Sequence, residues 1–201
     1  MMSKLLVPIS SIPKENGSVH DLIALTPLGA HTPRSDNYGG ITLTEITDVA
    51  LASVAARLGR EADAAALIAA VTGTDAPAPA RSSDRAFWMG PDQWMVEAPL
   101  ATHEDLARQI TAQANGAASV TEQTDAWCRF DLKGERLADV FERLCAADLR
   151  RFTGGEAVRT TIEHLGCFLI CRSPAHVSVI GPRSSAESLH HALLTALKSA
   201  L

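Results

Sequence analysis

A short motif occurs twice in this chain, and its recurrence constrains the fold more than any other feature. The segment TEITD covers residues 44–48, and TEQTD covers residues 121–125, 77 residues further along. Four matching residues arise easily by chance, so the match is informative only if the surrounding patterns repeat as well. The hydrophobic periodicity around each copy therefore decides what the recurrence means.

Around the first copy, the pattern predicts strands, a helix, a hairpin and a second helix. Residues 41–46 alternate as in a half-exposed strand, and residues 49–59 predict a second extended segment, although their alanines also permit a helix. Residues 60–71 carry apolar side chains at helical spacing. A hairpin is expected over 85–98, because Gly-Pro-Asp-Gln at its centre is turn chemistry, and a capped helix is expected from Thr102.

The second copy is followed by the same order of patterns. Residues 126–134 alternate as a strand, and residues 135–144 have helical spacing. A hairpin follows, with its first strand through Leu169 and Ile170 and its turn at Ser173-Pro174. A helix is then expected, capped by one of the two serines at 184 and 185.

The matching order predicts an α+β fold built from a duplicated βαββα unit, with antiparallel or mixed sheets and helices on one side. We expect one domain over residues 39–201, made of two pseudo-repeats at 39–116 and 117–201. Residues 1–38, with several prolines and no sustained period, predict an extended N-terminal arm. The arm either orders against a partner or lies as a strap on its own chain.

Composition excludes several classes of function. The chain has 18 basic and 23 acidic residues and no dense basic run, so the electrostatic signature of nucleic-acid binding is missing. Its longest apolar run, at residues 64–71, is far shorter than the roughly 20 residues of a membrane helix, and Pro8 interrupts any signal-peptide pattern. We expect a cytoplasmic protein with reduced cysteines.

Histidines and cysteines predict packing rather than metal binding. His190 and His191 are adjacent and point about 100° apart on a helix, so solvent-facing or partly packed side chains are expected. Cys167 and Cys171 lie in a predicted strand, where four residues span about 13 Å, too far to share one zinc ion. Free cysteines are usually buried, which favours the core for both.

No phosphate-binding loop, nucleophile elbow or zinc-protease motif is present in the sequence. The nearest group of acids comes from the two motif copies, at Glu45, Asp48, Glu122 and Asp125. Carboxylates at strand ends more often accept backbone N–H bonds than move protons, so capping or turn stabilisation is their expected role. We therefore predict no catalytic, cofactor-binding or metal-binding residue in this chain.

Three tryptophans stand out in a chain with 4% aromatic residues, and two of them, Trp88 and Trp94, flank the predicted hairpin turn. One interpretation places these rings, with Trp127, in the core. The other makes Trp88 and Trp94 a candidate interface, since large aromatic side chains often anchor protein contacts.

A resemblance to a known family covers most of the chain and is densest over residues 120–194. Four segments of this region resemble the gamma subunit of heterotetrameric sarcosine oxidase. They are TEQTDAW, the predicted helix ERLADVFERLC, RTTIEHLG and PRSSAESLHHAL. GPDQWMV at 90–96 and TPLGAH in the arm also fit. That family is similar in fold to the folate-binding domain of the glycine-cleavage aminomethyltransferase, whose repeated α+β unit agrees with the duplication expected above.

The resemblance implies an accessory, noncatalytic subunit of an oxidoreductase that demethylates sarcosine to glycine and passes the one-carbon unit to tetrahydrofolate. The implied partners are the alpha, beta and delta subunits, which would hold FAD, FMN, NAD, tetrahydrofolate and zinc, while this chain binds none of them. Two alternatives stay open: a free-standing folate-binding or one-carbon transfer protein, and the corresponding subunit of an N-methylglutamate dehydrogenase. A related folate-binding protein of iron–sulphur cluster maintenance carries a Lys-Gly-Cys-Tyr-x-Gly-Gln-Glu loop, and LGCFLICR at 165–172 lacks its Lys, Tyr, Gln and Glu.

Overall fold

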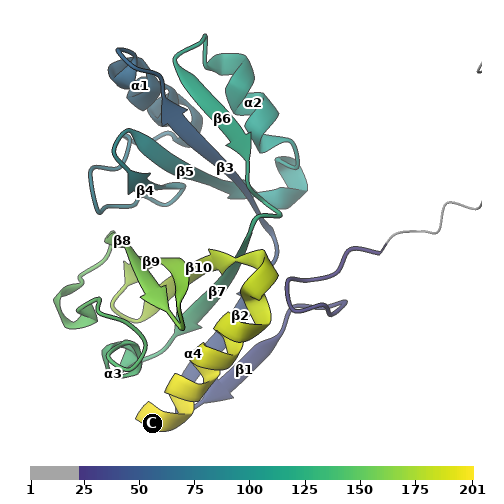
Figure 1. The fold of residues 1–201 in the computed structure, drawn as a ribbon, viewed down its shortest axis with the longest axis vertical. Helices are drawn as coiled ribbons and strands as arrows, with labels where there is room; N and C mark the ends of the chain where they lie inside the picture. The colour runs from purple at the N-terminus through teal and green to yellow at the C-terminus, as the bar shows by residue number, and fades with distance from the viewer. Residues whose placement is uncertain (1–22) are drawn as a thin grey trace, which may run out of the picture.

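The strands of this protein form two antiparallel sheets, as the computed structural model of residues 23–201 shows (Figure 1). The elements up to residue 116 are β1 (Ser35–Tyr38), β2 (Ile41–Ile46), β3 (Val49–Ala56), α1 (Glu61–Thr72), β4 (Ala86–Gly90), β5 (Gln93–Pro99), η2 (Leu100–Thr102) and α2 (Leu106–Gln113). Those of the second half are β6 (Ala118–Glu122), β7 (Trp127–Lys133), α3 (Leu137–Phe141), η3 (Leu149–Arg151), β8 (Ala157–Ile162), β9 (Leu165–Ser173), β10 (His176–Pro182), η4 (Arg183–Ser185) and α4 (Ala186–Ala200).

The two sheets exchange one strand between the halves of the chain. The six-stranded sheet has the order β1-β2-β7-β10-β9-β8, and the four-stranded sheet has the order β4-β5-β3-β6. The chain therefore crosses from one sheet to the other between β2 and β3, and again between β6 and β7. The two motif copies lie at these crossings. In both halves the strand after the motif starts opposite the proline that ends the hairpin, Val49 opposite Pro99 and Trp127 opposite Pro182.

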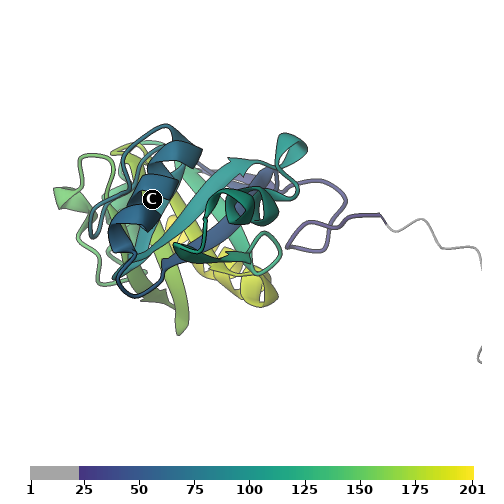
Figure 2. The same ribbon diagram turned by 90° about the horizontal axis from the view of Figure 1, so that it is seen from above.

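The sheets face each other, and helices cover both outer faces (Figures 1 and 2). Helices α1 and α2 pack on the four-stranded sheet, and α3 and α4 pack on the six-stranded sheet. The expectation of helices on one side is therefore wrong for the whole molecule. It holds for each sheet separately, because alternate strand residues form a second apolar layer between the sheets, which includes Phe87, Met95 and Phe168.

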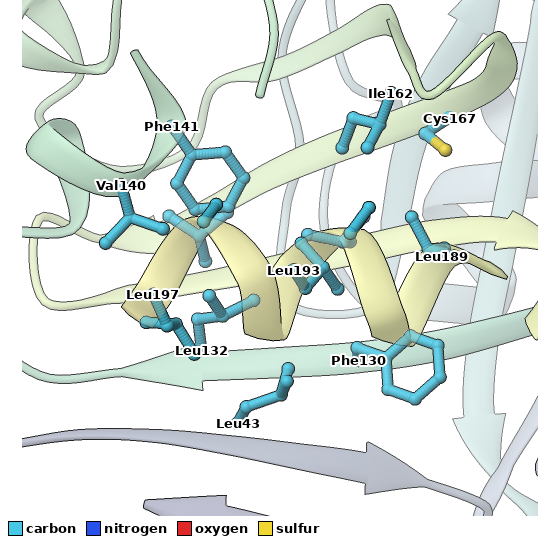
Figure 3. Packing of buried hydrophobic residues seen from close by; sticks show 14 of the residues in the cluster. Leu43, Phe130, Leu132, Val140, Phe141, Ile162, Cys167, Leu189, Leu193 and Leu197 are labelled. Atoms are coloured by element: carbon cyan, nitrogen blue, oxygen red, sulfur yellow. The ribbon is translucent and has the colours of Figure 1, made fainter. Parts of the chain in front are cut away.

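The largest apolar cluster of the described residues lies between the six-stranded sheet and its helices, including α4 (Figure 3). Leu189, Leu193 and Leu197 lie one turn apart on α4 and are fully buried against Phe130 and Leu132 of β7. This spacing places them on a single helix face. Replacing Leu193 by alanine would cost about 2–5 kcal/mol, the usual range for a buried leucine.

One side of the two-sheet layer is closed by the segment 80–83. Arg81 pairs with Glu156 beside β8, and Ser82 pairs with Phe87 of β4. Backbone groups of this segment also bind both edges, since Ala80 accepts from Ala157 N and Arg81 accepts from Trp88 N. The segment thus covers the edge strands β4 and β8, whose backbone groups would otherwise lie unpaired.

Most of the predicted elements are present. The expected hairpins are β4–β5 and β9–β10, and residues 49–56 form a strand rather than a helix. Ser185 is the N-cap residue of α4, as predicted, but its side chain makes no capping hydrogen bond. The predicted cap at Thr102 is wrong, because Thr102 ends the 3-10 turn η2 and Asp105 is the N-cap residue of α2. Helix α3 is shorter than expected, since after Phe141 the chain tightens into i→i+3 bonds such as Leu144 N to Phe141 O.

The predicted arm has a mixed outcome. Its first 22 residues lie outside the described part of the chain. Residues 35–38 form β1, which pairs with β2 at the edge of the six-stranded sheet. The residues between them, 23–34, form an irregular, mostly exposed segment at the side of the molecule.

Candidate functional site

A group of charged side chains lies between the two sheets, where the alternation of β7 and its neighbours places it. In β7, the apolar residues Cys128, Phe130 and Leu132 face the helices. Arg129 and Asp131 therefore point to the opposite face, towards the four-stranded sheet. Glu97 of β5 points from that sheet towards them, and both carboxylates are almost fully buried.

Glu97 is the acidic centre on the four-stranded side. Its two carboxylate oxygens accept from Arg172 Nη2 at 2.9 and 2.6 Å, and Arg129 Nη1 is 3.7 Å away. Arg172 also donates to Ser178 Oγ and to the Ser83 carbonyl oxygen. This ion pair joins β9 of one sheet to β5 of the other.

Asp131 is the acidic centre on the six-stranded side. Arg129 donates to both of its oxygens, at 2.7 and 2.9 Å, and His176 Nε2 lies 2.8 Å from Oδ2. Burial would raise the pKa of Asp131, but the hydrogen bonds and charge of Arg129 outweigh it and the pKa is lowered. Burial would likewise lower the pKa of Arg129, yet its acidic neighbours raise it. Both groups are therefore charged at neutral pH.

The chemistry available to this cluster is limited by its pairing. Its two arginines and two carboxylates pair with one another, and the Asp131 carboxylate is held as an ionised acceptor rather than as a proton donor. General acid–base catalysis needs a group whose pKa lies near the working pH. The cluster has the features of a clamp between the sheets.

A cavity of about 520 Å³ lies beside this cluster, where the chain crosses between the sheets. Both motif copies line it, the first with Ile46 and Thr47 and the second with Thr124 and Asp125. Trp127, Arg129 and Arg183 form further wall, and residues 24–27 with His31 and Pro33 close one side. We call it the crossing cavity. Its volume is within the range of small-molecule sites, about 300–1,000 Å³.

A second cavity of about 540 Å³ lies on the other side of Arg129 and Val49. Asp48, Asp84 and Glu97 contribute carboxylates to it, and Arg85 lines the same wall. Positive and negative side chains are thus mixed around both cavities.

The predicted role of the four acidic residues of the motif copies, capping or turn stabilisation, is only partly confirmed. Glu122 accepts from Thr124 N of its own turn at 2.6 Å, so turn stabilisation is confirmed for Glu122, whereas Glu45 accepts two backbone N–H groups from Leu28 and Arg34, earlier in the chain. Asp125 is exposed and lies 3.7 Å from Arg183. Asp48 lines the second cavity. The structure does not bring these four carboxylates together into one site.

The tryptophans divide between the core and its margins. Trp94 is 7% exposed and donates from Nε1 to the Pro77 carbonyl oxygen, so its ring is part of the core. Trp88 is half-buried against the same cluster. Trp127 packs edge-on against Phe168 and donates to Gln123. Within this chain only Trp88 of the predicted pair presents part of its ring, and the interface role stays a prediction.

Histidines and cysteines are mostly packed. His191 is exposed, but His190 is buried, contrary to expectation, because Asp36 of β1 covers it at 2.9 Å. All four cysteines are free, and burial raises the pKa of Cys128 to about 12 and that of Cys167 to about 11. Over residues 23–201, no group of three His, Cys, Asp or Glu side chains is arranged to hold a metal ion.

The charge clamp was missed by reasoning from the sequence. The alternation in β7 shows which face is polar, but a polar face normally meets solvent, and nothing local indicates that a second sheet covers it. The available signal was an arginine in each of β7 and β9, on the strand face that points away from the helices. In the described part of the chain, no helix is long and apolar enough to span a membrane.

Comparison with known proteins shows the fold. No known family profile and no curated protein sequence matches the chain. A chain of heterotetrameric sarcosine oxidase from Corynebacterium sp. U-96 superposes with a TM-score of 0.71 at 22% identity, over 82% of this chain and 87% of that one. Glycine cleavage system aminomethyltransferase T from Bartonella henselae superposes with a TM-score of 0.56 at 13% identity, over 78% of this chain but 46% of that one. The protein thus has the fold shared by a sarcosine oxidase chain and by part of an aminomethyltransferase.

Proposed function

We propose that this chain is the accessory, noncatalytic gamma-type subunit of a sarcosine oxidase-like oxidoreductase. The observation that carries the proposal is the similarity to a chain of such an assembly, which covers 82% of this chain and 87% of that chain. The matched chain is therefore about as long as this one, as expected for a separate small subunit rather than a domain of a large one. The sequence resemblance over residues 120–194 points in the same direction.

One feature of the site supports an accessory role. Glu97, Asp131, Arg129 and Arg172 are paired with one another between the sheets, so none of these four charges lacks a partner. In this proposal FAD, FMN, NAD, tetrahydrofolate and zinc belong to the alpha, beta and delta partners. This chain contributes a scaffold and a docking surface.

The docking surface is proposed to include residues 23–38. Of the four large apolar side chains that are exposed in the described structure, Ile23, Leu25 and Tyr38 lie in this segment, and the fourth is Leu58. Exposed apolar side chains gathered on one segment favour contact with a partner. The Trp88 to Trp94 hairpin is the second predicted contact.

Co-purification tests the proposal. The tagged chain would be co-expressed with candidate alpha, beta and delta subunits and isolated by size-exclusion chromatography. We expect a complex with sarcosine oxidase activity, and no flavin or activity with the chain alone. Leu25→Asp should weaken assembly, whereas Leu58→Asp, which changes an even more exposed leucine in the turn before α1, should not. Free elution of the wild-type chain would contradict the subunit assignment.

Free-standing folate binding is the second candidate, and the aminomethyltransferase-like fold together with the crossing cavity favours it. Calorimetric titration of the isolated chain with tetrahydrofolate separates the two. Stoichiometric binding without partners supports this candidate, and no heat at millimolar ligand rejects it. A subunit of an N-methylglutamate dehydrogenase would instead assemble normally and show that substrate preference.

We also infer that the two halves derive from one duplicated unit. The support is the matching register, with Val49 opposite Pro99 and Trp127 opposite Pro182. A profile built from homologous first halves should align with second halves in this register. Alignment in any other register would reject the duplication.

A further inference from the structure

Residues 23–34, which we call the strap, are attached to the protein at few points. No residue of the strap is fully buried, and only Thr26, Pro27 and Leu28 are half-buried. The strap has its own turn, in which Thr26 N donates to Ala30 O and Gly29 N donates to Thr26 O. This turn gives the strap internal hydrogen bonds of its own, and Leu28 packs against the apolar cluster of the six-stranded sheet.

Glu45 makes the main attachment. Its side chain is almost fully buried, and its two oxygens accept from Leu28 N at 2.9 Å and from Arg34 N at 3.0 Å. The Glu45 backbone N–H also donates to Arg34 O. Hydrogen bonds from N–H groups to an ionised carboxylate are about twice as strong as neutral ones. One side chain thus holds both ends of residues 28–34.

Arg183 makes the second attachment, from the opposite side of the crossing cavity. Its Nη2 donates to Leu25 O at 2.9 Å, while its other contact, with the exposed Asp125, is loose at 3.7 Å. Between these two attachments the strap forms one wall of the crossing cavity. In Figures 1 and 2 it lies at the side of the molecule, next to the junction of the sheets.

We propose that the strap is a hinged cover over the crossing cavity, with Glu45 as its latch and Arg34–Ser35, where β1 begins, as its hinge. Opening breaks the hydrogen bonds of Glu45 and Arg183 and leaves β1 paired with β2. Glu122, the corresponding residue of the second motif copy, accepts a hydrogen bond from Thr124 N in its own turn and holds no such segment. The inference concerns the isolated chain and is independent of its assembly with partners.

Hydrogen exchange of the full chain tests the latch. In Glu45→Gln the side-chain amide offers one acceptor in place of two charged ones, so the amides of Leu28 and Arg34 should exchange about tenfold faster. Amides of β7 and β10 should be unchanged. The matched control is Glu122→Gln, in the second motif copy, which should leave the strap amides at their wild-type rates. Equal strap rates in wild type and Glu45→Gln would overturn the proposal.

Access to the cavity gives a second measurement. A cysteine introduced by Thr47→Cys lines the cavity behind the strap, and its rate of reaction with a thiol reagent should rise in the Glu45→Gln background but not in the Glu122→Gln background. The parent chain with its four native cysteines supplies the baseline. If Glu45→Gln fails to fold, the same measurement can be made on Arg183→Met. Arg183 is partly exposed, and its replacement removes only the hydrogen bond that holds Leu25 of the strap. Unchanged labelling in Arg183→Met, with a folded core, would then reject the cover.

Discussion

Breaking the Glu97–Arg172 ion pair should destabilise the whole fold. The side chains of Glu97 and Arg172 are 6% and 15% exposed, so neither charge is well hydrated when its partner is lost. Replacing one member of a buried pair costs about 3–5 kcal/mol. In Glu97→Ile, Arg129 keeps Asp131, and Arg172 keeps two neutral acceptors, so we expect the lower end of that range, about 3 kcal/mol.

Urea denaturation and thermal melting would measure this loss. For a chain of this size 1 kcal/mol corresponds to about 2–4 °C, so Glu97→Ile should lower the Tm by about 6–12 °C. The double variant Glu97→Ile with Arg172→Met should recover most of the loss, because no charge is left buried. Isoleucine fits this layer, since Ile180 holds the matching place in the second half.

A surface pair supplies the control. Asp63→Ala removes the exposed partner of Arg60 and should cost less than about 1 kcal/mol. The reasoning would be refuted if Glu97→Ile cost no more than Asp63→Ala. It would also be refuted if the losses of the two single variants simply added in the double variant.

Three further predictions follow from individual residues. Gly134 has φ +147°, and a Cβ there would lie 2.6 Å from the Gly40 carbonyl oxygen, so Gly134→Ala should lower the unfolding free energy by several kcal/mol. The control is Gly40→Ala, where φ is +82° and a Cβ would meet open space, and it should cost only about 1 kcal/mol. Equal losses in the two variants would contradict this reasoning. Cys128, whose pKa burial raises to about 12, should react with thiol reagents at pH 8 only as the protein unfolds, measurable by pulsed alkylation. Burial would raise the pKa of Glu156, but hydrogen bonds from N–H groups, including that of Gly154, lower it to about 2. The ionised carboxylate therefore stabilises the fold at pH values above its ordinary pKa of 4.5, and this stabilisation is lost as the pH falls towards 2. Stability of Glu156→Gln should change less over that range, and identical acid unfolding curves would reject the assignment.

Local signals account for most of what could be predicted. The β4–β5 hairpin was predictable because Gly-Pro-Asp encodes its turn, and α1 because its apolar spacing is regular. Strand β8 was missed because the turn that ends it contains Glu163 and His164, both with positive φ values of 46° and 67° and without a glycine or proline to mark the turn.

Long-range features were not accessible in the same way. The role of Glu122 as a turn acceptor was predicted from its type and position, and a hydrogen bond confirms it. That Glu45 holds a segment 17 residues earlier in the chain has no local signal. The same is true of His190, whose burial depends on a strand more than 150 residues away in sequence.

The strand exchange between the sheets determines how this chain comes apart. A cut at residues 116–117 would separate two pairs of neighbouring strands. The first fragment would hold β3 without its neighbour β6, and the second would hold β7 without its neighbour β2. Neither fragment should persist alone, and the two should regain native structure only when mixed. Loss of either sheet during denaturation should therefore carry the other with it, in one all-or-none step.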